Sequence, residues 1–145
     1  MTSPATESTV PVTTSARAHE MGYRAETTCA INVTDFKAAS RWYQDVLGFE
    51  PLYQMEEMGW GEFRTNVAGM SVGLSQVEPG SNDAPGPGGA TLTFGVDDID
   101  KSRALLEAKG VKFDGETREI PGMVRLATFF DPDGNSLMLA QGLMG

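Results

Sequence analysis

The stretch Phe129-Phe130-Asp131-Pro132-Asp133-Gly134-Asn135-Ser136-Leu137-Met138-Leu139 decides the fold of this chain. Apolar residues flank a centre of Asp, Pro, Gly and Asn, which are the residue types that tight turns require. Pro132 fixes its own φ, and the Asp-Gly-Asn that follows it tolerates left-handed backbone. The pattern predicts a strand, a turn and a returning strand. We expect Asp131 and Asp133 to hold the turn through local hydrogen bonds.

Composition restricts the classes of partner. The 145 residues suit one domain, and the net charge of −9 argues against a nucleic-acid partner or an anionic membrane surface. No apolar run is long enough to span a bilayer, so we expect no membrane partner. The lone Cys29 cannot form an internal disulfide, and its place on an apolar strand face predicts an inert buried thiol.

Residues 1–24 are rich in Thr, Ser, Pro and Ala, and they predict a disordered tail. The tail lacks the apolar core of a secretory signal, so we expect a cytoplasmic protein. The only histidine, His19, lies in it. Histidine is therefore absent from the expected folded part, which weighs against imidazole catalysis and imidazole metal ligation there.

Two segments of the remaining chain repeat one pattern. Alternating strands at 27–33 and 90–96 each precede an amphipathic helix, which Thr34 or Asp35 caps in the first segment and Asp97 or Asp98 in the second. The helices end at the glycines 48 and 110. Further strands are expected at 49–55, 60–66, 70–76, 111–113, 123–130 and 136–141. The first strands align at an offset of 63 and the later turn glycines, 69 and 134, at 65.

The repeat predicts an α+β domain over 25–145, built from two βαβββ modules. The first module is expected at 25–76, the second at 90–141, and a Gly/Pro linker at 77–89. One sheet with one helix leaves its other face open, so each module needs the other to close a core.

Strand faces that turn away from the helices predict a neutral pocket floor. In the first and last strands of each module these faces carry small residues and nothing ionisable. Exposed sheet faces usually carry Lys, Glu or Arg, so we favour a pocket over an open solvated face, which is the alternative. The expected floor consists of Thr28, Ala30, Asn32, Ser71, Gly73, Ser75, Thr91, Thr93, Gly95, Ser136, Met138 and Ala140.

Aromatic and methionine side chains are the expected walls, because they offer adaptable apolar surface to a bulky ligand. Core packing is the alternative for these residues. They are Tyr53, Met55, Met58, Trp60, Phe63, Met123 and Phe129. Two catalytic candidates lie nearby in the sequence pattern: Glu62 as an acid or base, and Arg125 as a contact for an anionic ligand. A solvated loop carboxylate and a surface salt bridge are the alternatives.

The helix segment Asp35-Phe36-Lys37-Ala38-Ala39-Ser40-Arg41-Trp42-Tyr43-Gln44-Asp45-Val46-Leu47-Gly48-Phe49 and the quoted hairpin together resemble the vicinal oxygen chelate superfamily. Its members are glyoxalases, extradiol dioxygenases, fosfomycin-modifying enzymes and bleomycin-resistance proteins. The resemblance covers residues 27–141. It implies two βαβββ modules that form a U-shaped sheet around a ligand site in a homodimer, and it leaves the activity open.

Enzymes of this superfamily hold a divalent metal through His or Glu on the first and last strands of each module. The resemblance places Thr28, Gly73, Thr91 and Met138 at these positions. The position of Met138 is typically Glu. Two hydroxyls, a glycine and a thioether do not supply the donors that a divalent ion requires. We therefore expect neither a metal nor another cofactor.

These observations favour a metal-independent member that binds a bulky, partly apolar small molecule, in the bleomycin-resistance manner of sequestering an antibiotic or metabolite. The acidic surface suits a cationic ligand. The alternative is a glyoxalase-like lyase, isomerase or dioxygenase. Such an enzyme is either metal-free and works by acid–base chemistry, or metal-dependent if the metal-ligand positions of the superfamily fall on residues other than those aligned here. A non-catalytic interaction module is a further alternative. We expect a homodimer, in which the modules pair within one chain or swap between two.

Overall fold

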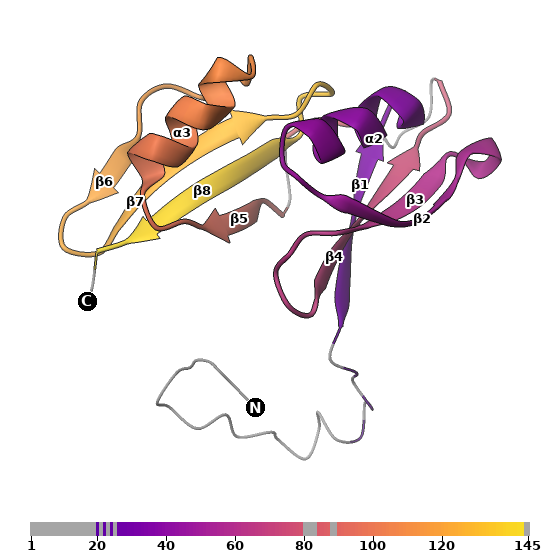
Figure 1. Ribbon diagram of the computed structural model, residues 1–145, viewed down its shortest axis with the longest axis horizontal. Helices are drawn as coiled ribbons and strands as arrows, with labels where there is room; N and C mark the ends of the chain where they lie inside the picture. The colour runs from indigo at the N-terminus through magenta and orange to yellow at the C-terminus, as the bar shows by residue number, and fades with distance from the viewer. Residues whose placement is uncertain are drawn as a thin grey trace.

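The computed structural model describes residues 20, 22, 24, 26–79, 84–87 and 90–143, which form two modules (Figure 1). Module 1 comprises β1 (Thr27–Val33), α2 (Phe36–Asp45), β2 (Glu50–Met55), the 3-10 helix η1 (Glu56–Met58), β3 (Trp60–Arg64) and β4 (Met70–Gln76). Module 2 comprises β5 (Leu92–Gly95), α3 (Ile99–Ala108), β6 (Arg118–Ile120), β7 (Val124–Phe130) and β8 (Ser136–Gly142). Most of the expected tail, with His19, and parts of the expected linker (80–83 and 88–89) lie outside the described residues.

Each module forms its own four-stranded sheet, and the two sheets share one topology. The strand orders are β1-β4-β3-β2 and β5-β8-β7-β6. In both sheets the first strand runs parallel to the last, and the other neighbours are antiparallel. The predicted α+β fold of two βαβββ modules is confirmed.

One strand of module 2 differs from its expected position. The segment 111–113 was expected to be a strand, but it contributes only an isolated bridge between Phe113 and Phe129. The edge strand is β6 instead, a three-residue segment whose side chains are all exposed. Because Arg, Glu and Ile in β6 do not alternate between a buried and an exposed face, periodicity gives no signal for this strand.

Both helices begin and end in the same way. The carboxylates of Asp35 and Asp98 cap α2 and α3, each accepting a backbone N–H of the first turn at 3.2 Å. Of the two residues proposed for each cap, the aspartate nearer the helix is therefore the N-cap. The predicted ends at Gly48 and Gly110 also agree, since both glycines follow the helices in left-handed backbone, with φ of 75° and 85°.

A glutamine at the end of each sheet supplies a second cap that the sequence pattern did not reveal. The side-chain oxygen of Gln76 in β4 accepts the backbone N–H of Phe36 at 2.7 Å. Gln141 in β8 accepts the N–H of Ile99 at 2.9 Å. The first N–H groups of a helix have no partner within the helix, so each glutamine satisfies one of them and ties the helix to the last strand of its module.

The helices cover the apolar face of each sheet and create one core. In Figure 1 both helices lie along the upper side of the molecule, with the sheets beneath them. Burial of each large apolar side chain contributes about 1.5 to 3 kcal/mol, so this shared core is the main source of stability. The largest side chains buried in it are Tyr43, Phe36, Phe63, Phe129, Leu74, Ile99, Leu137, Val33 and Val72.

The turn between β7 and β8 joins the modules. Asp131 is 4% exposed. One oxygen of its carboxylate accepts the backbone N–H groups of Asp133 and Asn135, at 2.9 and 2.8 Å. The other accepts the Tyr43 hydroxyl of α2 at 2.7 Å and the Asn135 side-chain amide at 2.8 Å. Burial and, after it, the Asp131 charge raise the pKa of Tyr43 far above its usual value. The predicted local bonds of Asp131 are present, together with a bond to the other module.

Three further hydrogen bonds cross this joint. Asp133 accepts from the backbone N–H and the hydroxyl of Thr34. The Asn135 amide donates to the carbonyl of Asn32 in β1 at 2.9 Å. The stretch that marks the hairpin in the sequence therefore also fixes how the two modules meet.

Candidate ligand-binding faces

Each sheet has a face that its helix does not cover, and we call it the open face of that module. Residues paired across neighbouring strands share a face, so the register assigns the members. The open face of module 1 consists of Thr28, Ala30, Asn32, Glu50, Tyr53, Met55, Trp60, Glu62, Arg64, Ser71, Gly73 and Ser75. The open face of module 2 includes Thr93, Gly95, Arg118, Leu126, Thr128, Phe130, Ser136, Met138 and Ala140.

Trp60 occupies the centre of the first open face because Gly73 gives it room. A Cβ built on Gly73 would collide with the six-membered ring of the Trp60 indole. Gly73 itself is buried, and Trp60 is half-buried. The indole therefore fills the place where a longer side chain at position 73 would lie.

A hydrogen-bonded network surrounds Glu62 on the same face. The Trp60 indole N–H donates to the Tyr53 hydroxyl at 2.8 Å. One carboxylate oxygen of Glu62 accepts the hydroxyls of Ser71, at 2.6 Å, and Thr28, at 2.9 Å. The hydrogen bond from Ser71 does most to lower the pKa of Glu62, and bonds from Thr28 and Tyr53 lower it further against the effect of burial. Glu62 is consequently a fixed negative charge beside two aromatic rings.

A hollow of about 460 Å³ adjoins this network at the β3–β4 turn. It is lined by Glu62 and Ser71 and by apolar side chains, among them Leu52, Val67 and Met70. Arg64 also lines it, and its charge is matched by Glu50 at 3.1 Å. The hollow is within the range of volumes typical of small-molecule sites.

The open face of module 2 is apolar at the equivalent place. Met138 pairs with Thr93 on one side and Thr128 on the other. Thr128 stands where module 1 has Glu62, and Leu126 stands where it has Trp60. Thr91 lies just before β5, with its hydroxyl 3.5 Å from that of Ser136. Arg118, on the edge strand, is the charged residue that the register assigns to this face.

The residues at the positions expected to bind metal do not fit a divalent ion. Thr28 is engaged by Glu62, position 73 is filled by the indole of Trp60, and Met138 lies between two threonines. Among the described residues, no three His, Cys, Asp or Glu side chains lie close enough together to share an ion. The register places two carboxylates on the open face of module 1, and one of them, Glu50, is paired with Arg64 at 3.1 Å. Glu62 is left as a single donor, which is a poor site for such ions.

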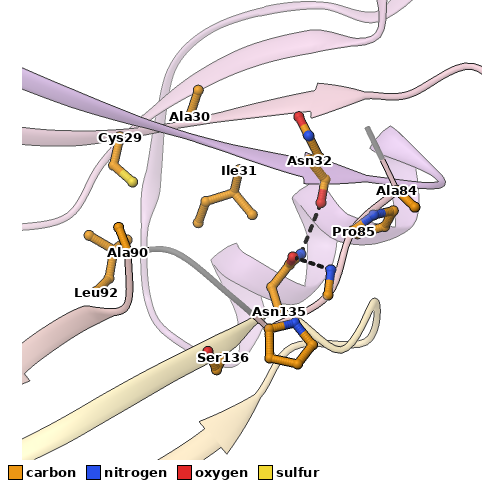
Figure 2. A pocket seen from close by; sticks show the side chains of 12 residues that line it. Cys29, Ala30, Ile31, Asn32, Ala84, Pro85, Ala90, Leu92, Asn135 and Ser136 are labelled. Carbon is orange, nitrogen blue, oxygen red and sulfur yellow. Dashed lines mark hydrogen bonds between the residues drawn. The ribbon is translucent and has the colours of Figure 1, made fainter. Parts of the chain in front are cut away.

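A pocket of about 390 Å³ lies where β1 meets module 2 (Figure 2). The Asn135 side chain reaches across it, donating to the Asn32 carbonyl and accepting the N–H of Gly86 at 2.9 Å. Ala30 and Cys29 also line it, and burial raises the pKa of the half-buried Cys29 thiol. The Asn135 amide and the Asn32 carbonyl serve the joint between modules, and the thiol is in its less reactive protonated form at neutral pH.

The other expected site residues are dispersed. Tyr53 and Met55 are 46% and 38% exposed, and Met123 is 54% exposed at the turn before β7. Phe63 and Phe129 do not line either open face. They are fully buried beneath the helices. Side chains alternate along a strand, so Phe63 points to the opposite face from Glu62, and Phe129 to the opposite face from Thr128.

The two catalytic candidates lie in different surroundings. Arg125 faces α3, where its guanidinium contacts Asp100 at 3.1 Å and Glu119 at 3.7 Å. These partners raise the pKa of Arg125, Asp100 most of all, and the pKa of Asp100 is lowered in turn. Glu62 is the only one of the pair on an open face. The predicted neutral floor did not include Glu62. The alternation in β3 could have indicated it, because Trp60, Glu62 and Arg64 share one face of that strand.

The fold and these faces define a class of protein: an α+β domain of two equivalent βαβββ modules with a ligand-sized, helix-free sheet surface. The family described as Glyoxalase/Bleomycin resistance protein/Dioxygenase superfamily has a model that matches residues 27–139. The chain belongs to this superfamily. A comparison with curated proteins finds no match to the chain.

Solved structures agree with this assignment. A superfamily member from Sphaerobacter thermophilus is 28% identical, with a TM-score of 0.68 over 80% of this chain and 95% of that one. TnmS3, described as an antibiotic binding protein from Streptomyces sp. CB03234, is 30% identical, with a TM-score of 0.65 over 81% and 94%. The fosfomycin resistance protein FosX from Listeria monocytogenes shares the fold at 18% identity and a TM-score of 0.65, over 81% and 93%. None of the described helices has the length and apolarity to cross a membrane.

Proposed function

We propose that this chain binds a bulky, partly apolar small molecule with a cationic group and sequesters it without chemical change. The observation that carries the proposal is the Trp60 indole, which lies over Gly73 and beside the Tyr53–Glu62 network. An aromatic ring thereby occupies the position from which enzymes of the superfamily are expected to hold a metal. An antibiotic or a comparable metabolite is the expected ligand.

Apolar contact would supply most of the affinity. Tyr53 and Met55 present about two fifths of their surface, and Met58 in η1 is 67% exposed. Ring stacking contributes about 0.5 to 1.5 kcal/mol beyond the area that it buries, and methionine side chains adapt to irregular ligands. This surface suits a fused or extended aromatic ligand.

Charge would supply the selectivity. The lowered pKa of Glu62 keeps its carboxylate ionised at neutral pH, so it would attract a cationic group on the ligand. The same shift argues against the alternative acid–base enzyme, because a carboxylate of lowered pKa is a weak base and holds no proton to give. The net charge of −9 adds a long-range attraction for cations.

We further propose that a second copy of the chain completes the site. Both modules carry exposed apolar side chains, with Met58 and Tyr53 on module 1 and Ile120 and Met123 on module 2. A homodimer would cover such surface around a bound ligand. The relative TnmS3, described as an antibiotic binding protein, supports the class of ligand.

Tryptophan fluorescence tests the proposal directly, since the chain has two tryptophans. We expect a panel of cationic aromatic antibiotics, titrated into the purified protein, to include a micromolar binder that quenches Trp60. The substitution Trp60→Phe should remove the quenching. Trp42→Phe is the matched control and should preserve it, because Trp42 lies on α2, edge-on to Tyr43.

Two results would contradict the proposal. One is a panel without any micromolar binder, and the other is quenching that survives Trp60→Phe but disappears in Trp42→Phe. Sedimentation of the protein with and without Met58→Glu tests the dimer separately. A monomer at micromolar concentration in the unsubstituted protein would refute that part alone.

A further inference from the structure

The repeat places two different residues at equivalent points of the two helices. Tyr43 of α2 and Leu106 of α3 lie at the same distance from their capping aspartates, Asp35 and Asp98. Both point toward the joint between the modules and belong to the shared core. Any difference in how they fill the joint therefore reflects the side chain and not the backbone.

The two sides of the joint are filled differently. Tyr43 is fully buried, and its hydroxyl reaches Asp131, the first residue after β7. On the other side, the first residue after β3 is Thr65, and Leu106 is much shorter than a tyrosine. Leu106 and Thr65 both line a pocket of about 410 Å³. A pocket of about 390 Å³ also lies on the Tyr43 side, but it is lined by Trp42, Asp131 and Pro132 and not by Tyr43 itself.

This pocket is separate from the open faces. It lies on the helix side of the sheet of module 2 (sheet 2), since Phe94, Phe129 and Leu139 line it and all three point away from Met138. Both modules contribute to its wall. Module 1 contributes Val46, Leu47 and Phe49, and α3 of module 2 contributes Leu105 and Leu106.

Three polar side chains line this pocket, those of Thr65, Ser102 and Lys109. The Thr65 hydroxyl already donates to the Met70 carbonyl at 2.9 Å and accepts the N–H of Val67 at 3.1 Å. Lys109 is the ionisable lining residue, and its ammonium donates to the Asp45 carbonyl at 3.0 Å. An ammonium has three donors, and among the described residues no carboxylate pairs with Lys109. A cation at the edge of an apolar pocket favours an anionic amphiphile.

We propose that this pocket is a second binding site, for a small carboxylate with an aromatic or short aliphatic body. The body lies among the apolar side chains between α3 and sheet 2, and the carboxylate lies at Lys109. The pocket volume is within the range of small-molecule sites. The proposal does not depend on ligand binding at the open faces.

Methyl NMR of the full chain, titrated with 4-butylbenzoate, tests it. We expect shifts of the Leu105, Leu106 and Leu139 methyl groups, and we expect Leu106→Trp to abolish them by filling the pocket. Lys109→Met should weaken 4-butylbenzoate binding about threefold, as for an exposed charge contact, and leave 4-butylbenzyl alcohol unaffected. Met138→Trp on the open face is the control and should change neither.

Three outcomes would overturn the proposal. They are shifts confined to the open faces, the absence of any shift at millimolar ligand, and equal binding of the carboxylate and the alcohol in both the unsubstituted protein and Lys109→Met. Lys109 is exposed, so its substitution keeps the test decisive even if Leu106→Trp fails to fold. Loss of binding in Met138→Trp with retention in Leu106→Trp would assign the ligand to the open face.

Discussion

Module 1 and module 2 have the same strand order and the same helix caps, which we call the shared frame. The side chains on their open faces differ. In both, an aspartate and a distant glutamine cap the helix, and the first strand pairs with the last. On the open face, however, module 1 has Trp60 and Glu62 where module 2 has Leu126 and Thr128. The hydrogen bonds that define the frame lie at the helix ends, away from the open faces. Those faces can therefore differ between the modules while the caps and the strand order stay the same.

The turns before the last strands show a second difference. Asp131 accepts four hydrogen bonds in module 2, one of them from Tyr43 of module 1. Its counterpart Thr65 makes two, both within its own turn. One turn therefore joins the modules and the other closes only its own hairpin. The substitutions below test these contrasts.

The largest expected effect comes from the joint. Asp131→Ala should lower the free energy of unfolding by about 3 to 5 kcal/mol, because four donors at a buried site lose their acceptor. The matched Thr65→Ala should lower it by about 1 kcal/mol. Urea denaturation measures both. Equal losses would mean that the Tyr43–Asp131 contact contributes little to joining the modules.

The next effect concerns Gly73, which lies at one of the positions where enzymes of the superfamily are expected to carry a metal-binding side chain. Gly73→Ala should cost about 1 to 3 kcal/mol, because the new Cβ collides with the Trp60 ring. Met138→Ala, at the equivalent place in module 2, should cost about 1 kcal/mol or less, since Met138 is half-buried. Denaturation and the Trp60 emission spectrum report the two changes. An unchanged spectrum in Gly73→Ala would show that the indole does not lie over position 73.

The glutamine caps should give smaller and equal effects. Gln76→Ala and Gln141→Ala should each lower the free energy of unfolding by about 1 kcal/mol, the usual cost of a lost helix cap. Circular dichroism during thermal melting measures both variants. A loss of stability in only one of the two variants would show that the two glutamine caps do not stabilise their modules equally.

The smallest effect is the pH dependence at Glu62. Its pKa is lowered in the folded protein, so its stabilising contribution is present above the ordinary glutamate value of 4.5 and is lost as the pH falls through the folded pKa. The stability difference between the unsubstituted protein and Glu62→Gln should therefore shrink between pH 7 and pH 3. A difference that grows over this interval would contradict the hydroxyl network.

Local signals in the sequence predicted most of the frame. Asp35, Asp98, Gly48 and Gly110 act at the helix ends through short-range geometry, and the alternation of the long strands reflects burial on one face. The internal repeat fixed the order of the elements. The edge strand β6 was missed, because pairing with β7 determines its position and its own side chains are all exposed.

The candidate site was predicted less well. The alternation placed the small residues of β1, β4 and β8 on the open faces, where the register has them. The strand that carries Trp60 and Glu62 was not assigned to faces, and Phe63 and Phe129 were expected at the ligand. A one-residue change of phase exchanges the two faces of a strand. The use of Gln76 and Gln141 as caps also depends on contacts between residues far apart in the chain.

These glutamine caps also bear on how the protein is made. The glutamine that caps α2 lies 40 residues after the N–H it accepts, and the one that caps α3 lies 42 residues after. During synthesis, neither helix can acquire this bond until the last strand of its module has left the ribosome. Each module can therefore form this helix cap only after its last strand has been synthesised. The hydrogen-bond partner of Tyr43 in module 1 is made later still, because Asp131 lies 88 residues further along the chain.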